Sequence, residues 1–242
     1  MKKSCPGSSG INKTILKHLP EAALSILQQI FNSALSAGYF PDTWKIATIR
    51  LITKAGKNSR RVENYRPISL LEVPGKIFER ILNKRLRQHL EFNNLHNPHQ
   101  HGFRQERGTT TALALITEQI AQYKADNGLC NIVLRDISKA FDKVWHQGLK
   151  YKLLHLRLPE ILERLLCDFL DDRVARIKIG SILGDSFDLK CGVPQGSVLA
   201  PTLFTIYTRD TPTSLTGYNI SYADDITQIV PYPGKSKEML RL

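Results

Sequence analysis

The stretch Tyr222-Ala223-Asp224-Asp225 stands between two short runs of β-forming residues, 218–221 and 226–230. This pattern predicts a β-hairpin with two adjacent acids at its tip. Like charges side by side are unfavourable unless a cation neutralises them, and Mg²⁺ prefers carboxylate oxygens. The alternative is a solvated turn, since Asp favours turns. The four residues alone leave both interpretations open.

A third carboxylate stands near the end of another predicted strand. Residues 131–137 read Asn-Ile-Val-Leu-Arg-Asp-Ile, a β-rich run that carries Asp136. A strand end and a hairpin tip can lie side by side in one sheet. Asp136 and Asp224 are therefore expected to bridge two metal ions, with Asp225 as a less certain third ligand, and such a site suits phosphoryl transfer. The alternative for Asp136 is to cap the following segment.

Several stretches resemble, in the same order, the motifs of reverse transcriptases from non-LTR (LINE-type, jockey-like) retrotransposons. The first catalytic motif matches DISKAFDKVWH at residues 136–146, the second matches GVPQGSVLAP at 192–201, and the third is YADD at 222–225. Upstream, NYRPISLL at 64–71 and QHGFR at 100–104 resemble the fingers motifs, and residues 3–11 resemble the segment before them. Together these motifs span nearly the whole chain.

The resemblance implies an α+β fold, the fingers and palm of a right-hand polymerase, with an antiparallel palm sheet packed on helices. We expect an N-terminal helical extension over residues 1–45, fingers over 46–130, a palm with the catalytic motifs over 131–234, and a truncated tail over 235–242. The chain ends seventeen residues after Asp225, so the thumb is expected to be absent. We expect a fragment or degenerate copy of a longer retroelement protein that supplies the thumb and endonuclease.

The implied activity is RNA-directed DNA polymerisation, in which a primer 3′-hydroxyl attacks the α-phosphate of a deoxynucleoside triphosphate (dNTP). The resemblance implies catalytic roles for Asp136, Asp224 and Asp225. Those acids and Ile137 form the expected metal site for two Mg²⁺ ions, which Mn²⁺ can replace. The expected partners are an RNA template, a DNA primer and dNTP.

The remaining motif residues are expected to bind substrate or nucleic acid. Phe141 would exclude a ribose 2′-hydroxyl by its bulk, while Gln195 and Gly196 would lie against the nascent base pair. Lys54 and Arg66 are candidates for triphosphate contacts. The candidates for contacts with the nucleic-acid backbone, where positive charge is favourable, are Lys57, Arg60, Arg61, Arg104 and Arg107. Each of these basic residues has a solvated surface position as its alternative.

The sequence departs from the family pattern in places. Thr53 and Ala55 replace usual prolines, and Arg135 replaces a frequent apolar residue, so one face of its strand is expected to be partly open. The lysine that would protonate pyrophosphate has no secure candidate. A second hypothesis is a catalytically inactive nucleic-acid-binding fragment. An RNA-dependent RNA polymerase is a third, weakened by the absence of Gly-Asp-Asp and by Phe141.

Composition agrees with a nucleic-acid partner. The formal charge is +12, and residues 1–108 hold 18 Lys and Arg against 7 Asp and Glu. A basic surface attracts phosphate backbones. The four cysteines have no zinc-type spacing, so free thiols are expected. His96, His99 and His101 are expected in a solvated loop. No apolar segment reaches membrane-spanning length, and an intracellular, non-secreted protein is expected, in the nucleus or cytoplasm.

Local patterns also predict most secondary structure. An extended leading segment covers 1–19, and Pro20 opens a helix that Gly38 ends. Thr109 is expected to cap a helix that runs to about 126. A strand over 174–179 should pair with 186–191 through a turn at 181–185. Further helices are expected at 75–92, 147–156, 159–170 and 198–207, with a strand at 46–53 and a hairpin around 222–225.

Overall fold

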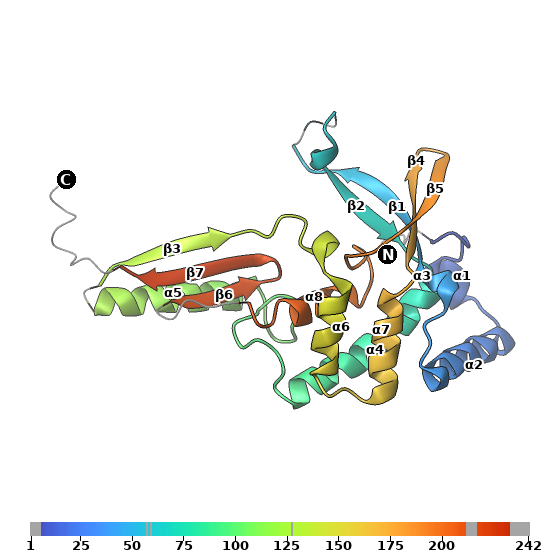
Figure 1. Ribbon diagram of the computed structural model, residues 1–242, viewed down its shortest axis with the longest axis horizontal. Coiled ribbons are helices and arrows are strands. Elements are labelled where there is room, and N and C mark those ends of the chain that lie inside the picture. Colours follow the sequence, from blue (N-terminus) through green and yellow to red (C-terminus); the bar gives the residue numbers. More distant parts are fainter. Residues whose placement is uncertain (1–5, 57, 59, 127, 212–216, 233–242) are drawn as a thin grey trace. The chain divides into compact units, whose positions relative to one another are not determined.

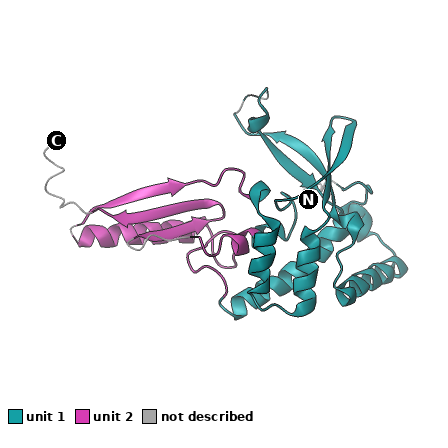
Figure 2. Ribbon diagram, viewed as in Figure 1, with its two compact units in different colours: residues 1–94, 141–203 teal, residues 95–140, 204–242 magenta. Residues whose placement is uncertain are grey.

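The structure is a computed structural model, which describes residues 6–56, 58, 60–126, 128–211 and 217–232 (Figure 1). The chain forms two compact units, each built from two stretches (Figure 2). Unit 1 comprises Met1–Asn94 and Phe141–Leu203, and unit 2 comprises Leu95–Ala140 and Phe204–Leu242. The boundaries of these units follow the packing and differ from the functional boundaries expected from the sequence. The fingers and palm boundaries therefore stay predictions.

The helices of unit 1 follow the apolar periodicity of the sequence. In α4 (Val73–Phe92), Phe78, Leu82, Leu86 and Leu90 recur at four-residue steps, and all are buried. Gly38 ends α2 in the left-handed region at φ 64°, as predicted. The other helices of this unit are α1 (Lys13–Lys17), α2 (Glu21–Ala37), α3 (Asp42–Lys45), α6 (His146–Leu154) and α7 (Glu160–Leu170).

One short helix was not expected. The segment over residues 1–19 was predicted to be extended, but α1 lies within it. Its N-cap is Asn12, whose side-chain oxygen accepts hydrogen bonds from the backbone N–H groups of Thr14 and Ile15, both at 2.9 Å. Capping of this kind satisfies N–H groups that have no partner inside the helix.

A four-stranded sheet in the order β2-β1-β4-β5 completes unit 1. Its strands are β1 (Ile46–Thr53), β2 (Tyr65–Leu70), β4 (Val174–Ile179) and β5 (Ile182–Asp188). β1 pairs in parallel with β4, and the two outer pairings are antiparallel. β5 corrects the predicted strand at 186–191, because Ile179 pairs with Ile182 across a tight turn in which Gly180 adopts φ 60°. Only glycine adopts that conformation without strain.

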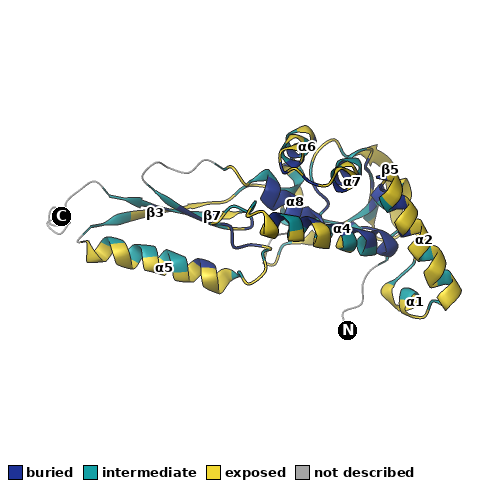
Figure 3. Ribbon diagram, turned by 90° about the horizontal axis from the view of Figure 1, so that it is seen from below, coloured by how far each residue is buried: buried dark blue, intermediate teal, exposed yellow. Residues whose placement is uncertain are grey.

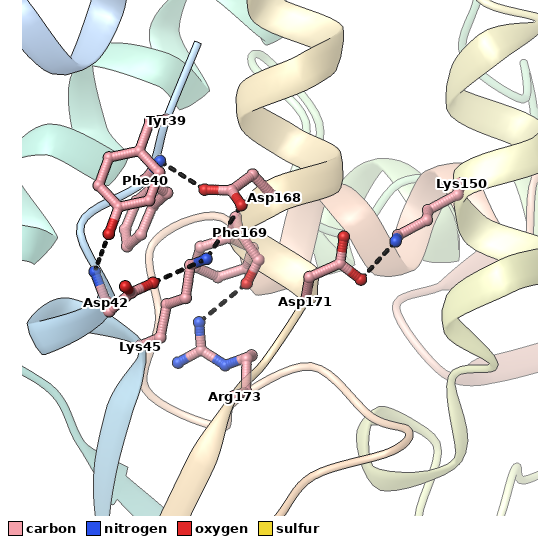
Figure 4. Close-up of polar contacts among 9 residues, drawn as sticks. All are labelled: Tyr39, Phe40, Asp42, Lys45, Lys150, Asp168, Phe169, Asp171 and Arg173. Atoms are coloured by element: carbon pink, nitrogen blue, oxygen red, sulfur yellow. Dashed lines mark hydrogen bonds and ion pairs between the residues drawn. The ribbon is translucent and has the colours of Figure 1, made fainter. Parts of the chain in front are cut away.

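The core of unit 1 contains an aromatic cluster and a buried ion pair (Figure 4). Phe40 is fully buried, and its ring centroid lies 5.1 Å from that of Phe169 and 5.6 Å from that of Phe78. The Nζ atom of Lys45 lies 3.0 Å from a carboxylate oxygen of Asp168, and only 2% of the Lys45 side chain is exposed. The other Asp168 oxygen accepts the backbone N–H of Phe40 at 2.6 Å. This carboxylate therefore fixes the chain at the start of α3.

Unit 2 contains a three-stranded antiparallel sheet in the order β3-β7-β6. The strands are β3 (Cys130–Arg135), β6 (Tyr218–Tyr222) and β7 (Asp225–Pro231). Helix α5 (Thr109–Ala125) packs on one face through Ala112, which joins Ile220 and Ile229 in a buried cluster (Figure 3). The N-cap of α5 is Gly108, so the prediction that Thr109 caps this helix was wrong. Helix α8 (Ala200–Tyr207) spans the boundary between the units.

Two smaller predictions concern thiols and membranes. Cys130, Cys167 and Cys191 are free, as expected, and Cys5 lies outside the described residues. In the part of the chain that the structure describes, no helix is long and apolar enough to cross a membrane.

Candidate active site

The acidic turn of unit 2 is a two-residue hairpin loop. Tyr222 pairs with Asp225, which leaves Ala223 and Asp224 as the loop residues. Ala223 adopts φ 58°, a left-handed conformation that is strained for a residue with a Cβ atom. A positive φ at the first loop position is typical of type II′ turns, whose twist matches that of the flanking strands. The predicted hairpin is therefore confirmed, with Asp224 at its tip.

The third acid lies at the same end of this sheet. Arg135, the last residue of β3, pairs with Ile226 of β7. Asp136 directly follows Arg135, and Asp225 directly precedes Ile226, so both acids lie at the end of this pairing. Asp136 and Asp225 are exposed, and Asp224 is half-buried. The fold thus brings together three acids that are distant in the sequence.

The chemistry of these donors fits a hard divalent cation, since all three are carboxylates. Among the described residues, however, no group of three or more His, Cys, Asp or Glu side chains lies close enough to hold a metal ion. The backbone therefore positions the expected ligands at one end of the sheet, while their side chains are not gathered. Ile137, the fourth expected member, lines a small cavity of about 10 Å³ together with Ala223 and Ile226.

A second group of predicted residues lies in unit 1, around the loop of residues 192–197. The backbone N–H of Val193 donates to the carbonyl oxygen of Phe141 at 2.8 Å. The backbone N–H of Ser69 donates to the carbonyl oxygen of Gln195, also at 2.8 Å. Gly196 adopts φ 127°, and a Cβ atom there would lie 2.7 Å from the backbone carbonyl oxygen of Ser69. The close approach at Gly196 is to the backbone of Ser69, and the predicted approach to a base pair stays a prediction. These bonds join the candidate sugar gate to the 192–197 loop.

The side chain of Gln195 is held within unit 1. Its Nε2 atom donates to a carboxylate oxygen of Asp142 at 2.9 Å. Both residues line a cavity of about 440 Å³ between the 192–197 loop and strands β1 and β2. Asp142 lies in a short 3-10 helix, Phe141–Lys143, and its side chain accepts this hydrogen bond from the amide of Gln195.

The predicted triphosphate ligands lie on one hairpin of unit 1. Arg66 of β2 pairs with Ile52 of β1, and the N–H of Lys54 donates to the Asn64 carbonyl at 2.8 Å, which extends the ladder. The side chain of Arg66 lies on the same face of the hairpin as that of its partner Ile52, and side chains two residues apart on a strand, such as Ile52 and Lys54, also share a face. Lys54 and Arg66 are therefore diagonal neighbours on one face. The Lys54 ammonium donates to the Glu63 carbonyl at 2.9 Å. Arg60 and Arg61 are exposed in the same connection, and Lys57 lies outside the described residues.

The remaining two basic candidates lie in unit 2 and support a loop. Arg104 donates to the Asn97 carbonyl at 3.1 Å, and Arg107 donates to the Pro98 carbonyl. The His-containing loop of residues 96–101 was expected to be solvated, but only 3% of His101 is exposed. Burial lowers the pKa of His101, as do the nearby positive charges of Arg107 and Arg104.

Sequence reasoning missed one buried acid, Glu79. Its carboxylate accepts the Ser197 hydroxyl and the backbone N–H groups of Val198 at 2.6 Å and Leu199 at 3.2 Å. Burial raises the pKa of Glu79, and burial lowers the pKa of nearby Arg173 to about 10. Glu79 stands three residues before Leu82 on the apolar face of α4. An acid within an apolar stripe was the signal that could have revealed it.

Solved structures identify the class of fold. Apo telomerase from Candida tropicalis, truncated from its C-terminal domain, aligns with a TM-score of 0.54 at 13% identity over 90% of this chain and 51% of that chain. The complex of telomerase from the same organism with a fragment of telomeric RNA gives a TM-score of 0.56 at 14% identity, over 91% and 41%. The α+β chain therefore has the fold of right-hand polymerases, as predicted.

Sequence comparison identifies the family. Residues 52–241 match the family model described as reverse transcriptase (RNA-dependent DNA polymerase). The probable RNA-directed DNA polymerase from transposon BS of Drosophila melanogaster is 37% identical over 93% of this chain and 26% of that protein. The RNA-directed DNA polymerase from mobile element jockey of the same organism is 35% identical over 98% and 26%. The chain belongs to the reverse transcriptase family, and it spans about a quarter of the length of these relatives.

Proposed function

We propose that this chain is the polymerase domain of a non-LTR retrotransposon and copies RNA into DNA. The observation that carries the proposal is the position of Asp136, Asp224 and Asp225 at one end of the β3-β7-β6 sheet. The relatives from jockey and from transposon BS are named RNA-directed DNA polymerases, which supports the same activity. The proposed partners are an RNA template, a DNA primer and dNTP.

In the proposed reaction the 3′-hydroxyl oxygen of the primer forms a bond to the α-phosphorus of dNTP. The bond from that phosphorus to the bridging oxygen of the β-phosphate breaks, the primer hydroxyl loses its proton, and pyrophosphate leaves. Asp136, Asp224, Asp225 and Ile137 would hold two Mg²⁺ ions, or Mn²⁺ in their place. Bound divalent cations supply positive charge for the attacking and leaving oxygens in such reactions.

The residues of unit 1 would select and orient the nucleotide. Lys54 and Arg66 carry positive charge that would offset the charge developing on the leaving pyrophosphate. Phe141 would leave no room for a ribose 2′-hydroxyl. The Gln195 side chain is held by Asp142 without any substrate present. Gly196, which has no Cβ atom, would let the backbone approach a base pair. Arg60, Arg61, Arg104 and Arg107 would add sequence-independent attraction for the template, together with Lys57.

Primer extension tests this proposal. The 242-residue chain is incubated with an RNA template, a DNA primer, dNTP and Mg²⁺, beside the variants Asp224→Ala and Glu118→Ala. The last variant removes an exposed acid on α5. We expect product from wild type and Glu118→Ala and none from Asp224→Ala. Product from Asp224→Ala would remove this residue from the catalytic role, and preference for ribonucleotides would indicate an RNA polymerase.

A second candidate function is nucleic-acid binding without catalysis. The observation that favours it is that the described carboxylates are not gathered into a group able to hold a metal ion. In that case the wild-type chain would shift an RNA–DNA hybrid in a gel but yield no extended primer, with either Mg²⁺ or Mn²⁺.

A further inference from the structure

The loop of residues 96–101 is joined to β6 by an isolated parallel β-bridge. The His99 carbonyl accepts the backbone N–H of Ser221 at 2.9 Å, and the N–H of His101 donates to the Ser221 carbonyl at 2.8 Å. Gln100 therefore forms a parallel bridge with Ser221, two residues before the acidic turn. The backbone pairing stops at Ser221, but the side chain of Gln100 continues it.

The amide of Gln100 pairs with both backbone groups of Ala223. Its Oε1 atom accepts the N–H of Ala223 at 2.9 Å, and its Nε2 atom donates to the Ala223 carbonyl at 3.2 Å. Oε1 also accepts the N–H of Gly102 at 2.8 Å. Two N–H groups pointing at one atom fix it as the oxygen end of the amide. A primary amide carries the same donor and acceptor as a peptide group, so Gln100 replaces the next step of a β-ladder.

The fit between these segments is close and buried. Only 5% of Gln100 is exposed, and a Cβ atom on Gly102 would lie 2.3 Å from the Ala223 nitrogen. Glycine is therefore required at position 102 for the loop to reach the turn. The loop itself is fixed elsewhere, because the ring of His101 is hydrogen-bonded to the Thr111 hydroxyl at 2.8 Å. A buried amide with all these partners is costly to replace, since each lost partner leaves a buried polar group unsatisfied.

We propose that Gln100 is a positioning residue for the catalytic turn. Its amide holds Ala223 in the left-handed conformation, which is strained for a non-glycine residue, and so sets the direction in which the chain presents Asp224 and Asp225. The role in catalysis rests on the proposed polymerase function, whereas the hydrogen bonds to Ala223 do not. The same reasoning gives Gly102 a purpose, because it makes room for the turn that Gln100 holds.

Hydrogen exchange tests the clamp without any assay of activity. Amide exchange of the 242-residue chain is followed by NMR for wild type, Gln100→Met, Gln100→Glu and Gln105→Ala, the last being an exposed glutamine of the same unit. Gln100→Met keeps the side-chain length but removes the acceptor. We expect the Ala223 amide to exchange roughly tenfold faster or more in this variant, with Ser221 unchanged, because only the bond to Ala223 is lost.

Rescue by the related variant separates this role from simple packing. Gln100→Glu retains an oxygen that can accept both N–H groups, so the protection of Ala223 should return to within about threefold of wild type. Gln105→Ala should match wild type throughout. Unchanged Ala223 exchange in Gln100→Met, or exchange in Gln100→Glu as fast as in Gln100→Met, would overturn the proposal. If the Ser221 amide also exchanges faster in Gln100→Met, that variant is locally unfolded, and the exchange of Ala223 in Gln100→Glu then tests the proposal by itself.

Primer extension then connects the clamp to catalysis. In Gln100→Met we expect the turnover number to fall about 10–100-fold, because misplacement of catalytic groups by about 1 Å has effects of that size. The KM for dNTP should change less than threefold, since the predicted triphosphate ligands lie in unit 1. Faster Ala223 exchange with unchanged turnover would overturn the positioning role. If wild type itself extends no primer, the polymerase proposal fails, while the exchange experiment still decides the clamp.

Discussion

Removal of Glu79 should destabilise unit 1 because one buried carboxylate accepts three hydrogen bonds. In Glu79→Ala the Ser197 hydroxyl and the Val198 N–H lose their acceptor. Leu199 is affected less, since its N–H also lies 3.0 Å from the Ser197 oxygen. An unsatisfied buried polar group costs about 1–3 kcal/mol, so two such groups predict a loss of ~2–6 kcal/mol in the free energy of unfolding. Glu79→Gln keeps an acceptor of equal size and should lose under ~1.5 kcal/mol.

The assay can be restricted to unit 1. Trp44 and Trp145 are the two tryptophans of the chain, and both belong to this unit, so their fluorescence during urea unfolding reports on it alone. Glu118→Ala, an exposed change in unit 2, is the control and should leave the transition unchanged. Equal losses in Glu79→Ala and Glu79→Gln would show that the hydrogen bonds from residues 197–199 to this side chain do not provide the stability.

The difference in stability between wild type and Glu79→Gln should depend on pH. Burial raises the pKa of Glu79 above its ordinary value of 4.5, so the folded state binds this proton more tightly than the unfolded state. Stability from this group is therefore greatest below pH 4.5 and falls as pH rises through the folded pKa. Because Glu79→Gln cannot titrate, its stability relative to wild type should increase with pH over this interval. A difference that is independent of pH would contradict this account.

Three further changes have defined outcomes. Gly196→Ala should lower the free energy of unfolding of unit 1, measured in urea, by more than Gly180→Ala. Both changes strain the backbone by ~1–3 kcal/mol, but only the Cβ atom at position 196 would meet a backbone oxygen, at 2.7 Å. Asp168→Ala should lower the free energy of unfolding by ~2–4 kcal/mol, because the buried Lys45 ammonium would keep only its ion pair with the exposed Asp42. Asp171→Ala removes a more exposed ion pair and should lower it by under ~1 kcal/mol. Phe141→Val should raise the ratio of ribonucleotide to deoxynucleotide incorporation roughly tenfold in primer extension, and an unchanged ratio would exclude Phe141 as the sugar gate.

Local patterns in the sequence predicted the elements that carry the proposed catalytic acids. The β-branched run before Asp136 and the hairpin around Asp224 required only alternation and turn chemistry. Their meeting at one end of a sheet follows once the two segments pair. The resemblance to reverse transcriptases supplied the proposed roles of Phe141, Gln195 and Gly196, which no local pattern could have assigned.

The features that sequence reasoning missed depend on contacts between distant segments. The parallel pairing of β1 with β4 joins Ala47 to Ala175, and nothing local to either strand specifies that register. Gln100 was taken as one member of a motif because its role requires the position of Ala223, more than a hundred residues away. Tertiary pairing determines such partners, whereas periodicity determines only the elements.

The open face of β3 affects how the isolated chain behaves in solution. Exposed fractions reach 47% for Ile132, 43% for Val133 and 77% for Leu134, and among the described residues β3 pairs only with β7. An apolar edge strand with free backbone groups is a template for pairing with another molecule. The isolated chain should therefore self-associate at high concentration, and a charged gatekeeper such as Leu134→Lys should keep it monodisperse.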